Sequence, residues 1–280
     1  FIMEKTMKTS GTETLSVSAN IFVGQTEAPI LIGPFISSMT NSELMAIMVG
    51  GFATAAGSVM ALYVSWLTEI PNIAGHLLAA SVMSAPAALM VAKIIYPETK
   101  STKSIHSLSI NEGSETTNVM DAIGKGATNG MKLAANVAAM LIAFISIVAM
   151  LNFFLSYIGT SLEDTLGLFF RPIAWSMGIP WNEAAIVGTL MGEKIVLTEL
   201  IAFNDLSKLT QQNLLSERSS IIASYALCGF ANFGSIGIQL GGIGSMAPNR
   251  RNDLSNIVLK AMIGGAIASW LTASIAGILV

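Results

Sequence analysis

The chain has 280 residues, of which 52% are hydrophobic and only 11% are charged, and its mean hydropathy is +0.66. Soluble domains carry about 25% charged residues, so this composition excludes a disordered chain, a disulfide-rich scaffold and an ordinary soluble enzyme. A net charge of −3 provides no basic field for a nucleic acid, and the single cysteine, Cys228, has no partner for a disulfide. We expect an all-α membrane protein with several transmembrane helices.

Five stretches without a charged residue predict transmembrane helices, because about 20 apolar residues cross the hydrocarbon core of a bilayer. In chain order these stretches are 44–68, 70–92, 133–162, 219–249 and 261–280. Tyr63 lies near the end of the first stretch, where an aromatic side chain is expected at the membrane–water interface. Residues 114–132 mix apolar and charged side chains and are typical of an amphipathic interfacial helix.

Two other apolar regions, 14–38 and 166–203, are interrupted near the middle by acidic residues. A carboxylate at the centre of a lipid-facing helix costs about 3 kcal/mol or more, so both regions are predicted to be re-entrant hairpins whose tips lie in protein or water. The order hairpin, span, span then occurs twice, the second time inverted, with the third span as the link. Such an inverted repeat is typical of secondary transporters.

The chain accordingly divides into six consecutive parts. They are a first re-entrant hairpin at 1–43, two transmembrane helices at 44–96, a cytoplasmic polar segment with an amphipathic helix at 97–132, a transmembrane helix at 133–160, a second re-entrant hairpin at 161–204, and an outer segment with two transmembrane helices at 205–280. Ten of the 14 Lys and Arg residues fall on one predicted side of the membrane and three on the other, with Lys194 inside the second hairpin. Because basic loops stay in the cytoplasm, the sequence predicts a multi-pass protein of the cell (inner) membrane with its C-terminus outside the cytoplasm.

Clusters rich in glycine and serine interrupt the first and fourth predicted spans, at 50–58 and 229–235. Small residues are common where membrane helices pack closely, and close packing alone could account for either cluster by itself. Two clusters at corresponding places in two halves instead predict broken helices whose unwound backbone forms a binding site at the membrane midplane. Free carbonyls there can bind a cation, and helix N-termini can bind a polar solute.

The predicted hairpins contain acidic residues, which are functional by default when they are buried in a membrane. They are Glu27, Glu183, Glu193 and Glu199. Some of them could instead be structural partners of Lys194, and the run Gln25-Thr26-Glu27 could be a helix N-cap. The sequence contains no nucleophile elbow, P-loop or HExxH motif, so it gives no sign of an enzyme.

Five long segments carry a family resemblance. They are SANIFVGQTEAPILIGPFI at 18–36, MVGGFATAAGSVMA at 48–61, NEGSETTNVMDAIGKGATNGMKLAANV at 111–137, PWNEAAIVGTLMGEKIVLTEL at 180–200 and YALCGFANFGSIGIQLGGIGSMAPNRR at 225–251. Together they resemble the concentrative nucleoside transporter family over essentially the whole chain. That family usually has further transmembrane helices before the first hairpin, so the chain is expected to be a fragment or to lack those helices.

The resemblance implies a set of substrate-binding residues. For the base of a nucleoside they are Gln25, Thr26, Glu27 and Val59, and for the ribose and its surroundings they are Glu199, Phe230, Asn232 and Ser235. The resemblance also implies a homotrimer in the lipid bilayer, in which each protomer has a transport domain and a scaffold. The expected function is a cation-coupled symporter that imports nucleosides by alternating access, with no nucleic acid partner and no catalytic residue.

A coupling sodium ion is implied between the first hairpin and the first broken helix. Its ligands are the side chains of Asn20 and Thr54 and the carbonyls of Val23 and Ala55, all uncharged oxygens of the kind that suit a hard monovalent cation. Glu27 could carry a proton instead, so proton coupling stays open. A membrane channel, and an intramembrane enzyme that uses Glu27 and Glu199 as an acid–base pair, are the alternatives from other functional classes.

Overall fold

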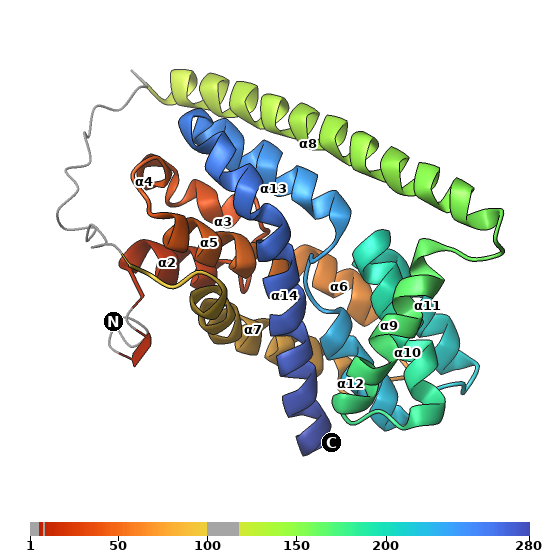
Figure 1. Ribbon diagram of the computed structural model, residues 1–280. Coiled ribbons are helices and arrows are strands. Elements are labelled where there is room, and N and C mark those ends of the chain that lie inside the picture. The colour runs from red at the N-terminus through yellow and green to blue at the C-terminus, as the bar shows by residue number, and fades with distance from the viewer. Residues whose placement is uncertain (1–5, 8, 100–117) are drawn as a thin grey trace.

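A computed structural model describes residues 6–7, 9–99 and 118–280, apart from five side chains in the long helix that begins at residue 119 (Figure 1). These residues form helices and no strand. The helices are α2 (Gly11–Ala19), α3 (Glu27–Ile30), α4 (Gly33–Ile36), α5 (Asn41–Ala53), α6 (Gly57–Trp66), α7 (Ile73–Ile95), α8 (Val119–Ser156), α9 (Leu162–Ser176), α10 (Trp181–Val196), α11 (Glu199–Gln211), α12 (Glu217–Leu227), α13 (Phe233–Met246), the short 3-10 helix η2 (Pro248–Arg250) and α14 (Arg251–Leu279). The all-α prediction is confirmed for this part of the chain.

Helix α5 is the centre of the core. Every one of its residues from Ser42 to Ala53 is buried, as expected for a helix that is apolar on all sides. It packs against α7 and α14, and a methyl group added at Gly265 of α14 would lie only 2.3 Å from the Cβ atom of Phe52. Helix α5 begins with a capping box in which the side chains of Thr40 and Glu43 each bind the other's backbone N–H.

Two helix pairs have a non-helical break between their members. Helix α5 ends at Ala53, the backbone of Thr54 and Ala56 is extended, and α6 follows. Helix α12 ends at Leu227, and α13 begins only after Asn232. We call residues 54–56 the first break and residues 228–232 the second break. They coincide with the glycine-rich clusters that the sequence placed in the first and fourth spans.

The two breaks lie against each other. Gly229 has a φ of +99°, and a Cβ atom at this position would lie 2.6 Å from the carbonyl oxygen of Ala53. Both the backbone conformation and the close approach therefore require glycine. The ends of α5 and α12 thus meet inside the bundle, where their unpaired carbonyls need other partners.

The predicted second hairpin, 161–204, contains parts of three helices rather than two. Helices α9 and α10 pack so closely that a Cβ atom at Gly188 would lie 2.5 Å from the carbonyl oxygen of Gly167. Helix α10 then ends at Val196, and α11 begins at Glu199 after only two non-helical residues. We call the link Leu197–Thr198 the second tip, and the non-helical residues 20–26 between α2 and α3 the first tip.

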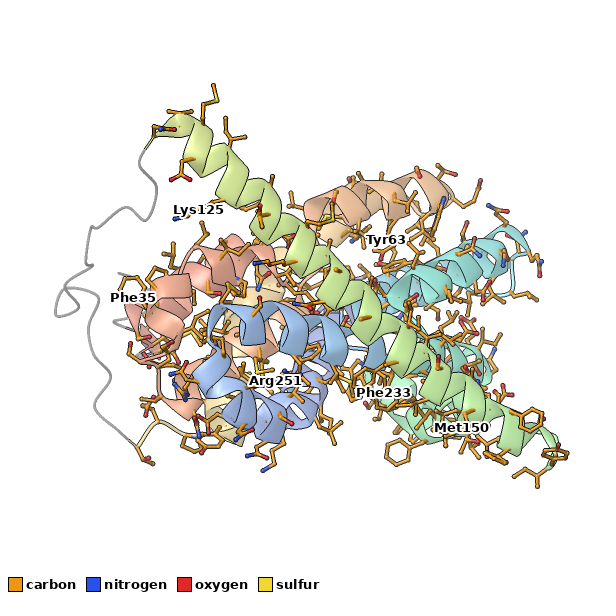
Figure 2. All side chains as sticks on the ribbon, turned by 90° about the horizontal axis from the view of Figure 1, so that it is seen from above. Phe35, Tyr63, Lys125, Met150, Phe233 and Arg251 are labelled. Atoms are coloured by element: carbon orange, nitrogen blue, oxygen red, sulfur yellow. The ribbon has the colours of Figure 1, made fainter. Side chains whose placement is uncertain are left out.

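Helix α8 is a single helix of 38 residues, whereas the sequence predicted an amphipathic helix at 114–132 followed by a separate span at 133–162. Residues 114–117 lie outside the described part of the chain. Viewed from above, α8 lies across the outside of the bundle, with Lys125 near one end and Met150 towards the other (Figure 2). It packs mainly against α13 and, near its C-terminal end, against α9.

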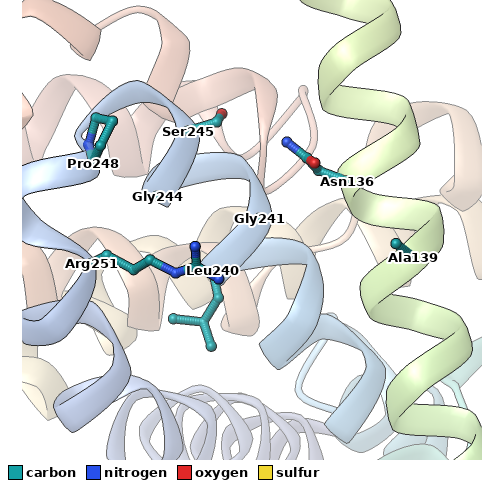
Figure 3. Close-up of a pocket in the computed structure, with 8 residues that line it drawn as sticks. All are labelled: Asn136, Ala139, Leu240, Gly241, Gly244, Ser245, Pro248 and Arg251. Carbon is teal, nitrogen blue, oxygen red and sulfur yellow. The ribbon is translucent and has the colours of Figure 1, made fainter.

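A cavity of about 330 Å³ lies between parts of α8 and α13 (Figure 3). Asn136 and Ala139 line it from α8, and Gly241, Gly244 and Ser245 line it from α13. The small residues on α13 leave this space open beside the long helix. None of the residues predicted to bind substrate or sodium lines it.

Three helical segments among the described residues are long and apolar enough to cross a membrane. They are Asn41–Trp66, Ile73–Ile95 and Pro248–Leu279. The predicted fourth span is divided by the second break into α12 and α13, and each of these is too short to cross a bilayer alone. Membrane-type helices are therefore present, and the number of crossings stays a prediction.

Candidate functional site

A pocket of about 470 Å³, mostly apolar with several polar side chains, lies where the two tips and the two breaks meet. It is lined by Gly24, Gln25, Thr26, Glu27, Ala56, Ser58, Val59, Thr198, Glu199, Leu200, Phe230, Asn232, Ser235 and Ile238. All eight residues predicted to bind substrate are in this set. Residues from opposite ends of the chain therefore line one pocket of the volume expected for a small-molecule site.

Glu199 is the buried carboxylate of the pocket. It is the first residue of α11, where free backbone N–H groups and the helix dipole favour a negative charge. Asn232 donates to its Oε2 atom at 2.8 Å, and the hydroxyl of Tyr63 donates to its Oε1 atom at 3.3 Å. The carboxylate is thus held in one orientation by side chains from the second break and from α6.

Tyr63 was predicted at the membrane–water interface, and that prediction is wrong. Its side chain is only 1% exposed, and its ring stacks on Phe203 of α11 with the ring centroids 4.0 Å apart. A tyrosine hydroxyl needs a partner when it is buried, and here Glu199 supplies it. The sequence carried no signal for this contact, because Tyr63 and Glu199 are 136 residues apart.

Asn232 shapes the second break as well as the pocket. Its side-chain oxygen accepts from the backbone N–H of Ser235 at 2.7 Å, so it is the N-cap of α13. Its side-chain nitrogen remains free to bind Glu199. One amide therefore starts α13 and aligns the carboxylate.

Gln25 connects the first tip to α13. Its Nε2 atom donates to the hydroxyl of Ser235 at 3.0 Å, and its Oε1 atom accepts from Nε2 of Gln239 at 3.2 Å. All three side chains are buried. Gln239 was not among the predicted site residues, because a single glutamine in an uncharged stretch gives no sign of its partner in the first tip.

Glu27 and Thr26 form the exposed edge of the pocket. The hydroxyl of Thr26 donates to Glu27 Oε2 at 3.0 Å. The Glu27 side chain folds back over Gly24, where a Cβ atom would lie 2.1 Å from Oε2. Glu27 is also the first residue of the short helix α3, but the structure shows no side-chain cap at its N-terminus.

The residues predicted to bind sodium lie where the first tip meets the first break. Asn20 and Thr54 are buried C-cap residues of α2 and α5. The Asn20 amide lies between Gly24 and Gly51, and the orientation that satisfies both neighbours puts its nitrogen 3.0 Å from the carbonyl of Gly24 and its oxygen 3.3 Å from the N–H of Gly51. The backbone N–H of Gly57 donates to the carbonyl of Phe22, which ties the tip to the break.

Uncharged oxygens dominate this place, as a hard monovalent cation requires. Thr54 donates its hydroxyl hydrogen to the carbonyl of Gly50 at 2.9 Å, which leaves the oxygen lone pairs available. Val23 is partly exposed, whereas Ala55 is buried. The described residues contain no cluster of His, Cys, Asp or Glu that could hold a metal ion.

Lys194 is a buried cation beside the second break. Its side chain is 1% exposed, and its ammonium donates to the carbonyls of Ala226 and Cys228, both at 3.0 Å. These described bonds go to the carbonyl end of α12 rather than to one of the hairpin carboxylates. Of those carboxylates, Glu183 accepts from Ser216, and Glu193 lines a separate pocket between α10 and α11.

Residues 76–277 match the C-terminal part of the Na+-dependent nucleoside transporters. This match covers well over half of the chain. The chain belongs to the Na+-dependent nucleoside transporter family. The resemblance stated from the sequence motifs is thereby confirmed.

Two relatives show how far the likeness extends. The chain is 44% identical over 302 aligned residues to sodium/nucleoside cotransporter 1 of Mus musculus, which covers 100% of this chain and 46% of that protein. It is 43% identical to the uncharacterized transporter YutK of Bacillus subtilis (strain 168), which covers 99% of this chain and 69% of that protein. The chain therefore spans about half the length of the mammalian relative. These relatives are transporters and not enzymes.

Solved structures agree with the fold. A structure of CNTnw in an inward-facing substrate-bound state has a TM-score of 0.82 and 43% sequence identity, and it covers 99% of this chain and 66% of that one. A structure of CNTnw in the intermediate 3 state has a TM-score of 0.86 and 41% identity, and covers 68% of that chain. Since identity exceeds 40% over nearly the whole chain, the helix arrangement is that of this family.

Proposed function

We propose that the protein is a sodium-coupled symporter that imports nucleosides by alternating access. The observation that carries this proposal is the pocket in which Gln25 of the first tip, Val59 of α6, Glu199 of α11 and Asn232 of the second break come together. Each tip and each break contributes lining, so a solute bound here touches every part that must move in an alternating-access cycle. The names of the mammalian relatives indicate sodium and nucleosides as the transported species.

The pocket has two chemically different ends. Glu199 and Asn232 offer a carboxylate and an amide that suit the vicinal hydroxyls of a ribose, and Phe230 gives an apolar surface nearby. Gln25, Thr26 and Glu27 offer donors and acceptors for a heterocyclic base, with Val59 as an apolar wall. Charge-assisted hydrogen bonds to the ribose are about twice as strong as neutral ones, so we expect Glu199 to contribute most to affinity.

Asn20, Thr54 and the carbonyls of Val23 and Ala55 would hold the sodium ion. The ion supplies positive charge at the carbonyl end of α5 and orders the first tip against the first break. Because Gln25 belongs to that tip, sodium binding would pre-organise the base end of the pocket. A coupling free energy of about 1–3 kcal/mol between ion and nucleoside is typical of such linkage.

The order of elements supports an inverted repeat. Each half consists of two helical arms around a tip, a helix pair around a break, and a long helix. In the first half these are α2 and α3–α4 around the first tip, α5 and α6 around the first break, and α7. In the second half they are α10 and α11 around the second tip, α12 and α13 around the second break, and α14. We therefore propose that the second re-entrant hairpin is α10–α11, with its tip at Leu197–Thr198, and not the α9–α10 pair. Helix α8 links the halves as part of the scaffold of a homotrimer. The excess of Lys and Arg on the side where the first hairpin begins supports a cytoplasmic location for that side and a C-terminus outside the cytoplasm.

Uptake by the protein in liposomes tests the proposal. An inward sodium gradient should drive saturable accumulation of radiolabelled uridine, recovered chemically unchanged, and replacing sodium with choline should abolish it. Non-saturable flux would indicate a channel, and altered uridine an enzyme. Accumulation driven by a proton gradient without sodium would instead support proton coupling through Glu27, the exposed carboxylate that begins α3 next to the first tip.

The variant Glu199→Gln tests the ribose assignment. It keeps a hydrogen-bonding group of the same size but removes the charge, so we expect kcat/KM for uridine uptake to fall about 10- to 100-fold. Glu183→Gln is the matched control, because Glu183 lies on the same hairpin but does not line the pocket. Equal losses in both variants, or wild-type uptake by Glu199→Gln, would contradict the assignment.

A further inference from the structure

Gln239 of α13, which the proposed function does not use, lies at the centre of a buried hydrogen-bond chain. Its side chain is 0% exposed, and its Nε2 atom donates to the carbonyl of Met48 at 3.1 Å and to Oε1 of Gln25 at 3.2 Å. Its own Oε1 atom is buried and has no partner. A buried amide with an unpaired oxygen is costly, so its presence here points to a role beyond packing.

The backbone carbonyl of Met48 fixes which way both amides face. A carbonyl oxygen can only accept, so the atom of Gln239 that meets it must be the nitrogen Nε2. The same nitrogen lies against Gln25, so the Gln25 atom there must be the oxygen Oε1. The orientation of a side-chain amide is normally assigned from its hydrogen-bond network. This network starts from the backbone carbonyl of Met48, whose oxygen can only accept.

The consequence for the pocket is a fixed donor. With its oxygen held by Gln239, Gln25 turns its Nε2 atom towards Ser235, which also lines the pocket. One Gln25 N–H binds the Ser235 hydroxyl, and the second remains for a ligand. The hydroxyl hydrogen of Ser235 is free as well, since its oxygen accepts from Gln25. The base end of the pocket therefore presents donors rather than acceptors at this point.

Both amides of the pair pack closely against α5. A Cβ atom at Gly51 of α5 would lie 2.7 Å from Nε2 of Gln239 and 3.2 Å from Cβ of Gln25. The glycine is what allows both amides to lie against α5. Gln239 thus contacts the first tip and α5 at once, while its own helix supplies Ser235.

We propose that Gln239 is a positioning residue that sets base preference. By holding the Gln25 amide with its N–H towards the ligand, it selects nucleosides whose base carries an oxo group at the edge remote from the sugar, the 4-oxo group of a pyrimidine or the 6-oxo group of a purine. In a nucleoside with an amino group at that edge, the N–H of the amino group would face the N–H of Gln25, and no hydrogen bond could form. This inference rests on the proposed function and specifies its substrate class.

Two substitutions at Gln239 separate orientation from packing. Gln239→Leu removes the bond to Gln25 and frees its amide to turn either way. In Gln239→Glu, the buried carboxyl group is expected to be protonated. Its one hydrogen is donated to the carbonyl of Met48, so the group can only accept a hydrogen bond from Gln25. The Gln25 amide must reverse and present its oxygen to the ligand.

The measurement is equilibrium binding of uridine, cytidine, inosine and adenosine to the purified protein in saturating sodium. The wild type should prefer uridine to cytidine, and inosine to adenosine, by about tenfold, which is the effect of one mismatched hydrogen bond. Gln239→Leu should bring both ratios close to one, and Gln239→Glu should invert them. A ratio of two affinities in one sample does not depend on the fraction that is folded.

The control and the overturning outcomes are distinct. Gln212→Glu makes the same chemical change at an exposed position outside the pocket and should leave both ratios unchanged. Equal affinities for oxo and amino bases in the wild type, or wild-type ratios in both Gln239 variants, would overturn the inference while leaving nucleoside binding intact. Absence of binding for all four nucleosides would instead contradict the proposed function itself.

Discussion

The two breaks differ in the groups that bind the backbone carbonyls at the end of the preceding helix. Each follows the C-terminus of a helix, where unpaired carbonyls carry a partial negative charge. At the second break, the Lys194 ammonium binds the carbonyls of Ala226 and Cys228, and the Ser269 hydroxyl donates to Cys228 as well, at 2.7 Å. At the first break, the described side-chain partners are neutral, chiefly Thr54 and Asn20.

This difference fits the proposal that a sodium ion binds at the first break and that none is required at the second. A lysine is a cation that is tethered to the chain, so the second break keeps its charge partner in every state. The first break has oxygens of the right kind but no tethered cation among its described contacts, and a mobile sodium ion would complete it. The ion can then arrive and leave with the substrate, which coupling requires.

Removal of the tethered cation should have the largest effect on stability. Lys194→Met keeps the length of the side chain but leaves two buried carbonyls without their charged donor, so we expect a loss of about 3 kcal/mol. Thermal unfolding in detergent should show the same drop in melting temperature in sodium and in choline. A drop seen only in sodium would break the comparison, because it would make Lys194 part of the sodium response.

The first break should respond in the opposite manner. Thr54→Val keeps the shape of the side chain and removes a proposed sodium ligand, so stability in choline should change little. The rise in melting temperature that sodium gives the wild type should shrink, and half-maximal stabilisation should need about tenfold more sodium. Thr160→Val, an analogous change in the link between α8 and α9, is the control. An unchanged sodium response in Thr54→Val would remove Thr54 from the site.

The smallest effect is expected from Ser269→Ala. The Cys228 carbonyl loses its hydroxyl donor but keeps Lys194, so the cost should be about 1 kcal/mol. Combining Ser269→Ala with Lys194→Met should cost more than the sum of the two, because the carbonyl then has no donor. Simple additivity in this double-mutant cycle would show that the two donors act independently.

Much of the site could be predicted from the sequence, though chiefly through motif resemblance. The runs around Gln25 and Asn232 are distinctive, and the structure brings all eight predicted substrate residues to one pocket. The breaks could be predicted from composition, because glycine and serine clusters at matching places in two spans favour unwound backbone. Both signals are local, so they can be recognised without knowledge of the packing.

Other features could not be predicted, because they depend on partners that are distant in the chain. Tyr63 was placed at the interface from its position in a span, but its hydroxyl is bound by Glu199. In the sequence, Gln239 is a polar residue in an apolar stretch, and its partner Gln25 is 214 residues away, so only the structure shows that the two side chains are bonded. The turn between α9 and α10 and the link between α10 and α11 are both short, so the sequence alone did not show which one reaches the pocket.

The sequence by itself determined that the chain is a helical membrane protein, where two of its helices break and which polar side chains are available at those breaks. These properties follow from hydropathy and backbone conformation, which act over a few neighbouring residues. The tertiary structure decided that Lys194 binds the carbonyls of the second break and that Gln239 orients Gln25. A hydrogen bond within a dry core exists only where packing brings donor and acceptor within about 3 Å, and that distance depends on the whole bundle.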